Sequence, residues 1–305
     1  MRAALFFLAK LIITAVLFWW LFELVSLKEL GLQISSVGAL GFIVAVVVLI
    51  MHVPAIIARW GMVQHAIGAP LRGATLFRLT MVSLFFNQML PAPVSGDAAR
   101  IIGLKAEGLE LSTASAGVLL DRLWGLAALL LIAVPFWPWM VPWVDDPVGY
   151  ATATATFGMV LAFWFLLRLR RPPAWLVRAA PEGLRPFLDA ASATASSWAR
   201  VFGLLAWSFA GHISAVAAMA ALAGAMGLQI SPFQIFVATN VALLAPIIPA
   251  SFAGWGVREA GLVLTLSSFG VDEASALALS VCFGMTLVPI ALPGGVIWMF
   301  RARSA

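Results

Sequence analysis

Residues 85–108 read FFNQMLPAPVSGDAARIIGLKAEG, and this stretch decides the fold. It begins with apolar residues that suit a lipid bilayer, breaks at Pro91 and Pro93, and then becomes charged, with Asp97, Arg100, Lys105 and Glu107. Irregular backbone at membrane depth persists only where protein buries it or water reaches it. The stretch therefore predicts a re-entrant hairpin over residues 76–107, which dips into the membrane and returns to the side it came from.

A second stretch shows the same order of features. Residues 246–261 read PIIPASFAGWGVREAG: apolar, broken by Pro249, Gly254 and Gly256, and then charged at Arg258 and Glu259. Together with the apolar residues on either side, this stretch predicts a second re-entrant hairpin over residues 233–269. We expect the two hairpins to meet and to form a polar site inside the membrane.

The composition excludes a soluble domain. Of 305 residues, 63% are hydrophobic and only 10% are charged, and the mean hydropathy is +1.05. A soluble surface needs far more charge than this. The apolar runs are continuous, which is typical of helices rather than of the alternating strands of a barrel. The sequence thus predicts an all-α polytopic integral membrane protein.

The net charge of +5 does not indicate nucleic acid as a partner, because basic residues at the ends of membrane helices act as cytoplasmic anchors. His52, His65 and His212 lack the spacing of metal ligands. We expect no metal and no other cofactor.

The apolar runs predict about six full transmembrane helices, over residues 3–25, 37–58, 112–135, 149–167, 201–226 and 274–299. Between them, residues 59–78 are interrupted by Arg59, Arg72 and Arg78, and are expected to form a helix on the membrane surface. Residues 184–200 have an apolar face at helical spacing and are expected to lie against the inner leaflet.

The whole chain, 1–305, is predicted to be a single membrane domain. Its first half is 1–167, its second half is 201–303, and the arginine-rich residues 168–200 form a cytoplasmic amphipathic connection. The distribution of lysine and arginine places both termini in the cytoplasm. The first hairpin then enters from the cytoplasm and the second from outside, which indicates an inverted repeat.

Charged residues at bilayer depth cost about 2.5–3.5 kcal/mol each on insertion scales. The candidates are Asp97, Arg100, Asp121, Arg122, Arg258 and Glu259. They should pair or face water. Neighbours on a helix, such as Asp121 and Arg122, point in different directions, so each needs a partner on another element. We expect Arg122 or Arg258 to approach Asp97, with Glu259 or Asp121 completing the network.

Two interpretations of these charges stay open. In the first, the ion pairs serve only to lock the hairpins together. In the second, one arginine is available for an anionic group, since its planar fork binds phosphate oxygens in pairs. Ser95 or Asp97 would cap a helix whose start offers N–H groups to a phosphate. Asn87 would either bind substrate or satisfy backbone groups near the prolines. The candidate substrate-binding residues are Asn87, Ser95, Gly96, Asp97, Arg100, Asp121, Arg122, Gly254, Gly256, Arg258 and Glu259.

The two motifs resemble those of a known family. The first is Asn87, Leu90, Pro91, Gly96, Asp97 and Arg100 with Asp121, Arg122 and Gly125; the second is Pro249, Gly254, Gly256, Val257, Arg258 and Glu259. In this order they resemble the lysylphosphatidylglycerol synthase transmembrane-region family, a flippase-like domain that also occurs in stand-alone YbhN-type proteins. The resemblance implies a multi-pass protein of the bacterial inner membrane that moves a lipid between leaflets.

The function we expect is that of a lipid translocator, moving an anionic or modified lipid headgroup through a polar midplane site. The alternative is a non-transporting membrane accessory protein for a lipid-modifying enzyme such as a glycosyltransferase, bound through residues 168–200. We expect no enzymatic activity, because no nucleophile with an adjacent base stands out, and no aminoacyltransferase domain follows Arg303.

Overall fold

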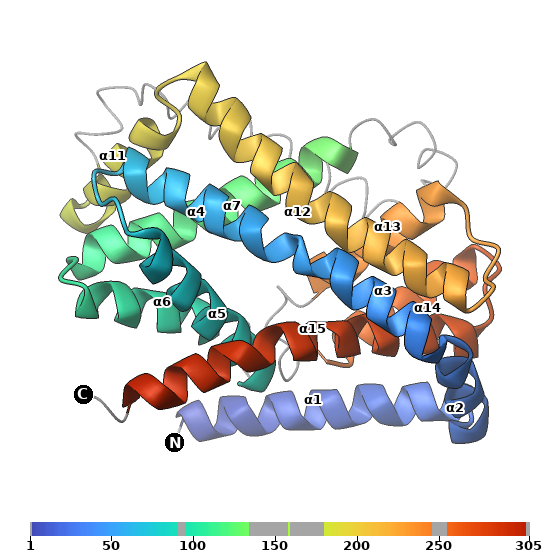
Figure 1. The fold of residues 1–305 in the computed structure, drawn as a ribbon. Coiled ribbons are helices and arrows are strands. Elements are labelled where there is room, and N and C mark those ends of the chain that lie inside the picture. The colour runs from blue at the N-terminus through green and yellow to red at the C-terminus, as the bar shows by residue number, and fades with distance from the viewer. Residues whose placement is uncertain (1, 91–94, 134–157, 159–179, 246–254, 303–305) are drawn as a thin grey trace. The chain divides into compact units, whose positions relative to one another are not determined.

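The structure, a computed structural model, describes residues 2–90, 95–133, 158, 180–245 and 255–302. Within this part of the chain all regular secondary structure is helical (Figure 1). The helices are α1 (Arg2–Leu24), α2 (Leu27–Ser36), α3 (Gly38–Ile50), α4 (His52–Ala66), α5 (Gly73–Met89), α6 (Ser95–Ala106), α7 (Leu111–Ala133), the 3₁₀ turn η3 (Glu182–Leu184), α11 (Arg185–Thr194), α12 (Trp198–Ala225), α13 (Pro232–Leu244), α14 (Val257–Ser268) and α15 (Glu273–Ala302).

The chain divides into two compact units. Unit 1 comprises Met1–His52, Arg78–Ala99 and Ile213–Ala305, and unit 2 comprises Val53–Phe77 and Arg100–His212. Helices α4, α5, α6 and α12 therefore contribute residues to both units. These units are not the two sequence halves, 1–167 and 201–303, that were expected on either side of residues 168–200. That division stays a prediction.

Unit 1 is organised around α15, which packs against α2, α3 and α14; α14 in turn contacts α13 and α1. Helix α15 also lies close to the described end of α5. A Cβ atom added at Gly294 would lie 1.9 Å from the carbonyl oxygen of Met81, and one at Gly295 would lie 2.5 Å from the Phe85 ring. The two glycines thus allow α5 and α15 to approach closely, as small residues do between membrane helices.

Unit 2 has a hydrophobic core drawn from α4, α7, α11 and α12, with Val63, Leu120, Trp124, Leu188 and Leu204 among its buried members. Residues 184–200 do not form the single amphipathic helix that was predicted, because α11 ends at Thr194 and α12 begins at Trp198. Helix α11 packs against α7 with its apolar face buried. The expected position of this segment against the inner leaflet stays a prediction.

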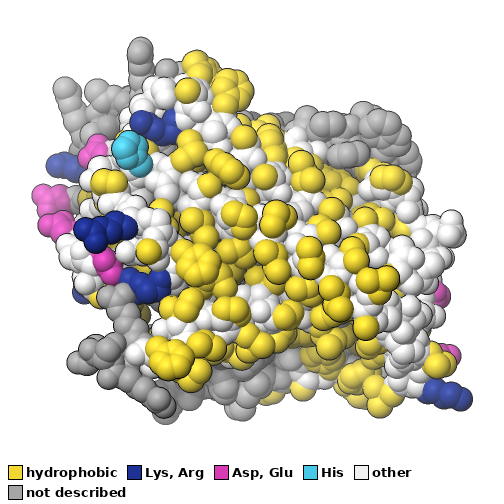
Figure 2. Space-filling model, viewed as in Figure 1, with side chains coloured by type: hydrophobic (Ala, Val, Ile, Leu, Met, Phe, Trp, Pro, Cys, Tyr) yellow, Lys and Arg dark blue, Asp and Glu magenta, His cyan; other side chains and the backbone are white. Residues whose placement is uncertain are grey.

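Three helical segments are long and apolar enough to cross a membrane: Gly38–Ala66, Trp198–Ala225 and Glu273–Phe300. They coincide with the predicted spans at 37–58, 201–226 and 274–299. Helices α1 and α7 cover the predicted spans at 3–25 and 112–135, and the predicted span at 149–167 lies almost wholly outside the described residues. Many large hydrophobic side chains are exposed on these helices, among them Leu40, Ile43, Phe202 and Phe300, as expected of a membrane protein (Figure 2).

The prediction of one surface helix over residues 59–78 is wrong. Helix α4 continues to Ala66, the chain turns through Gly68 at a φ of 77°, and α5 begins at Gly73. Arg59 consequently lies inside a candidate membrane span. It can do so because a buried carboxylate pairs with it, which the sequence pattern alone does not reveal.

Both predicted hairpins have helical arms on either side of their proline-containing segments. Helices α5 and α6 flank residues 91–94, and α13 and α14 flank residues 246–254; these two connecting segments lie outside the described residues. Helix α13 begins with a capping box, in which Ser231 Oγ accepts from Gln234 N–H and Gln234 Oε1 accepts from Ser231 N–H. That the hairpins re-enter the membrane stays a prediction.

Candidate functional site

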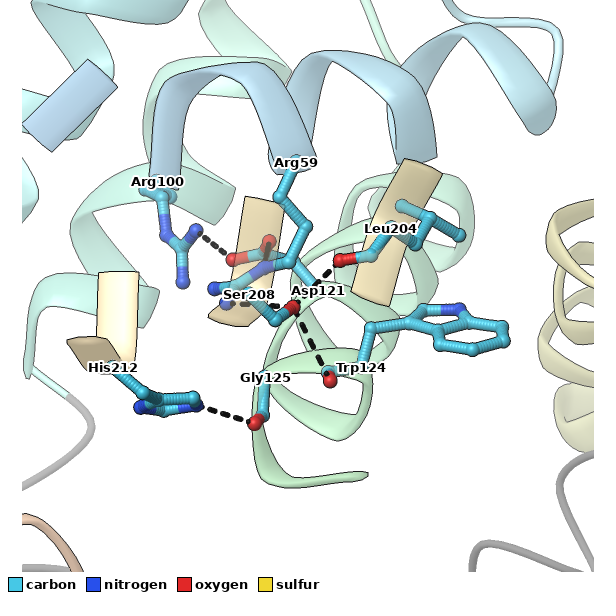
Figure 3. Close-up of polar contacts among 8 residues, drawn as sticks. All are labelled: Arg59, Arg100, Asp121, Trp124, Gly125, Leu204, Ser208 and His212. Carbon is cyan, nitrogen blue, oxygen red and sulfur yellow. Dashed lines mark hydrogen bonds and ion pairs between the residues drawn. The ribbon is translucent and has the colours of Figure 1, made fainter. Parts of the chain in front are cut away.

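In unit 2, two arginines converge on one buried carboxylate (Figure 3). Arg59 Nε of α4 donates to Asp121 Oδ1 of α7 at 2.7 Å, and Arg100 Nη1 of α6 donates to Asp121 Oδ2 at 2.8 Å. The Asp121 side chain is 1% exposed. Three helices are thus joined through the two oxygens of a single side chain. We call Arg59, Arg100 and Asp121 the carboxylate cluster.

Helix α12 is joined to the same cluster by Ser208. Arg59 Nη1 lies 3.4 Å from Ser208 Oγ, and that hydroxyl donates to the Leu204 carbonyl oxygen at 2.7 Å. One turn below, a ring nitrogen of His212 lies 2.8 Å from the carbonyl oxygen of Gly125 (Figure 3). A Cβ atom at Gly125 would lie 2.7 Å from Arg59 Nη1. The glycine therefore leaves room for the guanidinium group.

Two neighbouring polar side chains on α4 are buried. The Arg100 guanidinium lies 5.0 Å from the ring centroid of Trp60, a cation–π contact. The Trp60 indole N–H and both amide atoms of Gln64 are buried and make no hydrogen bond with any described residue. An unpaired buried polar group costs about 1–3 kcal/mol. These groups are therefore available to a polar ligand or to internal water.

In unit 1, Arg258 and Glu259 form a second buried ion pair, which we call the α14 cluster. Glu259 is fully buried and uses both carboxylate oxygens. Its Oε2 accepts from the backbone N–H of Gly256 at 2.7 Å, and its Oε1 accepts from Arg258 Nη2 at 2.6 Å. Ser280 Oγ lies 3.4 Å from the same Oε1.

The local backbone explains why these sequence neighbours pair with each other. Gly256 precedes α14 at a φ of 88°, a conformation that favours glycine. Glu259 stands three residues later and folds back to the Gly256 N–H, in the manner of a capping box. This turns its carboxylate toward Arg258. The expectation that neighbouring charged residues need partners on different elements fails here, because helix capping redirects the glutamate.

Arg258 is held on three sides. Its guanidinium lies 4.4 Å from the ring centroid of Trp255, and its Nε and Nη2 both donate to Glu259. A Cβ atom at Gly284 of α15 would lie 2.0 Å from Arg258 Nη2, so the guanidinium rests directly on this glycine. Arg258 Nη1 donates no hydrogen bond to any described residue, although the side chain is only 6% exposed.

One residue from an arm of each predicted hairpin lies against Gly284 of α15. Gln88, near the end of α5, places its amide nitrogen 3.5 Å from the Gly284 carbonyl oxygen, while Arg258 packs on the Cα of the same residue. Gln88 and Arg258 belong to different hairpins and lie in the same unit. The structure therefore brings polar residues of both hairpins to one position on α15.

In the first predicted hairpin, the start of α6 is hydrogen-bonded to the end of α5. Gly96 N–H donates to Asn87 Oδ1 at 2.9 Å, and Ser95 Oγ donates to the Phe86 carbonyl oxygen at 2.8 Å. Asn87 thus satisfies backbone near the prolines, one of its two predicted roles. The cap predicted for Ser95 is not formed, because α6 begins at Ser95 itself and its hydroxyl is engaged with Phe86.

The remaining predicted residues are placed as follows. Asp97 is buried in the first turn of α6, in unit 1, and Arg122 lies in α7, in unit 2. Gly254 lies outside the described residues. Sequence reasoning found Arg100 and Asp121 but assigned Arg59 to the membrane surface. It also overlooked Ser208, whose only signal is a hydroxyl in a mostly apolar helix.

Both clusters lie within a region that matches a known family. Residues 7–294 match the family model described as the lysylphosphatidylglycerol synthase TM region. The chain belongs to this family. The resemblance seen in the two proline-containing motifs is thereby confirmed, and with it a multi-pass membrane protein with a lipid-related function. No curated protein matches the chain.

Proposed function

We propose that this protein translocates a lipid with an anionic headgroup across the bacterial inner membrane, without enzymatic activity of its own. The proposal depends on the surroundings of Arg258. This residue is a buried arginine held in place by Glu259, Trp255 and Gly284, and its Nη1 donates no hydrogen bond within the described part of the chain. A buried guanidinium with unused donors is suited to the oxygens of a phosphate.

The geometry around Arg258 supports a ligand site rather than a simple lock. Both oxygens of Glu259 are already occupied, so the carboxylate holds the arginine without saturating it. Gln88 lies on the same glycine and adds a neutral amide. A phosphate bound here would contact residues of both predicted hairpins. Movement of one hairpin relative to the other would then change access to the headgroup.

The carboxylate cluster of unit 2 has a different role in this proposal. Arg59, Arg100 and Asp121 tie α4, α6 and α7 together, and Ser208 adds α12. We assign these residues to holding unit 2 in one arrangement. The interpretation that buried charges serve as locks is therefore retained for Asp121, whereas Arg258 is assigned to substrate.

The proposed topology has both termini in the cytoplasm and the two hairpins entering from opposite sides, with about six full spans. Exposed positions allow a test, because Gln229 precedes α13 and Arg185 begins α11. Single cysteines at these positions, in a Cys282→Ala background, should label from opposite sides of the membrane with an impermeant maleimide. Labelling of both from the same side would contradict the topology.

The activity is tested by lipid translocation in reconstituted vesicles. The probes are headgroup-labelled phosphatidylglycerol, a glycolipid and a polyprenyl phosphate. Arg258→Gln should abolish movement of the transported lipid, and Arg258→Lys should reduce it, because lysine keeps the charge but loses the planar fork. Arg185→Gln is the matched control, since it removes the same charge from an exposed position.

The outcomes separate the proposal from its alternatives. If Arg258→Gln and Arg258→Lys both prevent folding, Arg258 is a structural residue. If wild-type protein is folded and moves none of the lipids, a non-transporting accessory protein for a lipid-modifying enzyme becomes the better explanation. That alternative requires the arginine-rich connection, so Arg185→Gln should then weaken capture of the partner enzyme.

A further inference from the structure

Unit 2 contains a pocket of about 400 Å³ beside α4, and none of its lining residues belongs to the carboxylate cluster. Ala58, Gly61, Met62 and His65 of α4 line it, and these residues recur at helical spacing. Arg59 and Gln64 occupy the intervening positions and point elsewhere. The pocket is therefore distinct from the carboxylate cluster, although one helix serves both.

The walls of the pocket are fixed by close packing. A Cβ atom added at Gly61 would lie 3.0 Å from the Leu76 side chain of α5. One added at Gly203 of α12 would lie 2.5 Å from the Met62 side chain. Pro70 and Leu71, in the turn between α4 and α5, complete the apolar lining. Three helices thus hold an amphiphilic pocket, with apolar walls and two basic side chains.

Arg200 is one of those basic side chains, and its position is unusual. It lies in the first turn of α12, where the positive end of the helix dipole disfavours a cation. Its Nη1 is held by the Ala193 carbonyl oxygen and by Ser196 Oγ, in the chain segment that leads into α12. No carboxylate of the described residues pairs with it. The guanidinium is oriented but not neutralised, and an anion in the pocket would compensate both charge and dipole.

The pocket lies at the ends of two candidate membrane spans. His65 stands at the end of Gly38–Ala66, and Arg200 at the beginning of Trp198–Ala225. Trp198 and Phe202, both exposed, lie in the first turns of α12 with their rings tilted and the ring centroids 6.1 Å apart. Aromatic side chains gather at the depth of the headgroups.

We propose that this pocket binds a phospholipid by its phosphate, with Arg200 and His65 donating to the phosphate oxygens and Met62, Leu71 and Leu76 contacting the first carbons of the lipid. The phosphate would sit at headgroup depth, and the apolar walls distinguish a lipid from free phosphate. The site does not depend on the proposed function, because it shares no residue with the α14 cluster or the carboxylate cluster.

The test uses the full chain in neutral detergent and native mass spectrometry with added phosphatidylglycerol. Arg200→Gln should weaken retention of one phosphatidylglycerol molecule about tenfold or more, as expected for loss of a charge-assisted hydrogen bond to phosphate. Arg185→Gln, an exposed arginine near the same end of the protein, is the matched control and should change nothing. Arg200→Gln should weaken phosphatidylglycerol retention equally in an Arg258→Gln background. This result would separate the pocket from the proposed translocation site.

Two further arms identify the ligand. Diacylglycerol, which has the tails without the phosphate, should not be retained in the pocket, and glycerol phosphate at equal concentration should not displace phosphatidylglycerol. If Arg200→Gln does not fold, Ala58→Phe is the second variant. It fills the pocket while Arg200 itself is kept, and it should weaken phosphatidylglycerol retention to the same extent. If the Arg200→Gln or the Ala58→Phe variant retains phosphatidylglycerol as strongly as the wild-type protein does, the proposal is overturned. Displacement by glycerol phosphate would overturn the assignment to a lipid.

Discussion

Replacing Asp121 by asparagine tests the carboxylate cluster most directly. The substitution keeps the shape of the side chain but removes the one negative charge that Arg59 and Arg100 share. Removing one partner of a buried ion pair costs about 3–5 kcal/mol. Here the loss also leaves two guanidinium groups facing each other. At a separation of ~6 Å and an effective dielectric constant of 20, their repulsion is about 3 kcal/mol.

The arginine variants should be milder. Arg59→Gln leaves Arg100 paired with Asp121, so no buried charge loses its partner, and we expect a cost of about 1–3 kcal/mol from the lost hydrogen bonds. Asp121→Asn should therefore exceed Arg59→Gln by about 2 kcal/mol. The double variant Arg59→Gln/Asp121→Asn should be more stable than Asp121→Asn alone, because it removes one of the two repelling cations.

The assay measures the apparent melting temperature of the purified protein in detergent. Unfolding is detected as loss of the monodisperse peak in size-exclusion chromatography after heating. Asp121→Asn should lower the melting temperature by about 6–10 °C. Asp189→Asn, at an exposed position on α11, is the control for the chemical change and should leave it unaltered. Equal destabilisation by Asp121→Asn and Arg59→Gln would refute the reasoning, because charge balance would then not govern the cluster.

Three further substitutions probe close approaches and a helix cap. Gly284→Ala should reduce lipid translocation several-fold, because the new methyl group would lie 2.0 Å from Arg258 Nη2 and displace the guanidinium from its place beside Glu259. Gly224→Ala, where a Cβ atom meets nothing within 4 Å, is the control. Gly96→Ala should lower the free energy of unfolding by about 1–3 kcal/mol, because its Cβ would lie 2.3 Å from a backbone oxygen, and chemical denaturation measures this. Ser231→Ala should cost about 1 kcal/mol in the same measurement through loss of the α13 cap, and Ser231→Asn should not.

The sequence was sufficient to predict the helical class and the arms of both hairpins. Hydrophobic runs have a period and a length, and prolines interrupt them at definite positions, so α5, α6, α13 and α14 follow from local pattern. The three longest candidate spans follow for the same reason. The partner of α11 could not be predicted, because an apolar helical face is the same whether it packs on lipid or on α7.

The pairing of charges was harder to predict than their importance. Asp121 and Arg100 stood out as charges in apolar surroundings, but Arg59 did not, because its neighbours Arg72 and Arg78 suggested a surface segment. The pair between Arg258 and Glu259 depends on a backbone N–H at Gly256 that draws the carboxylate back over one turn. Such partners are set by three-dimensional approach and by capping, neither of which hydropathy records.

The hydrogen-bond partners of Asp121 and Glu259 bear on the charge of the proposed substrate. Asp121 gives one oxygen to each of two arginines, and Glu259 divides its oxygens between a backbone N–H and Arg258. A cationic headgroup at Asp121 or Glu259 would have to displace an arginine and so break a buried ion pair. An anionic phosphate would meet Arg258 without breaking any of these contacts. The arrangement therefore favours recognition of the lipid through its phosphate, and an additional amine on the headgroup would need to lie outside both clusters.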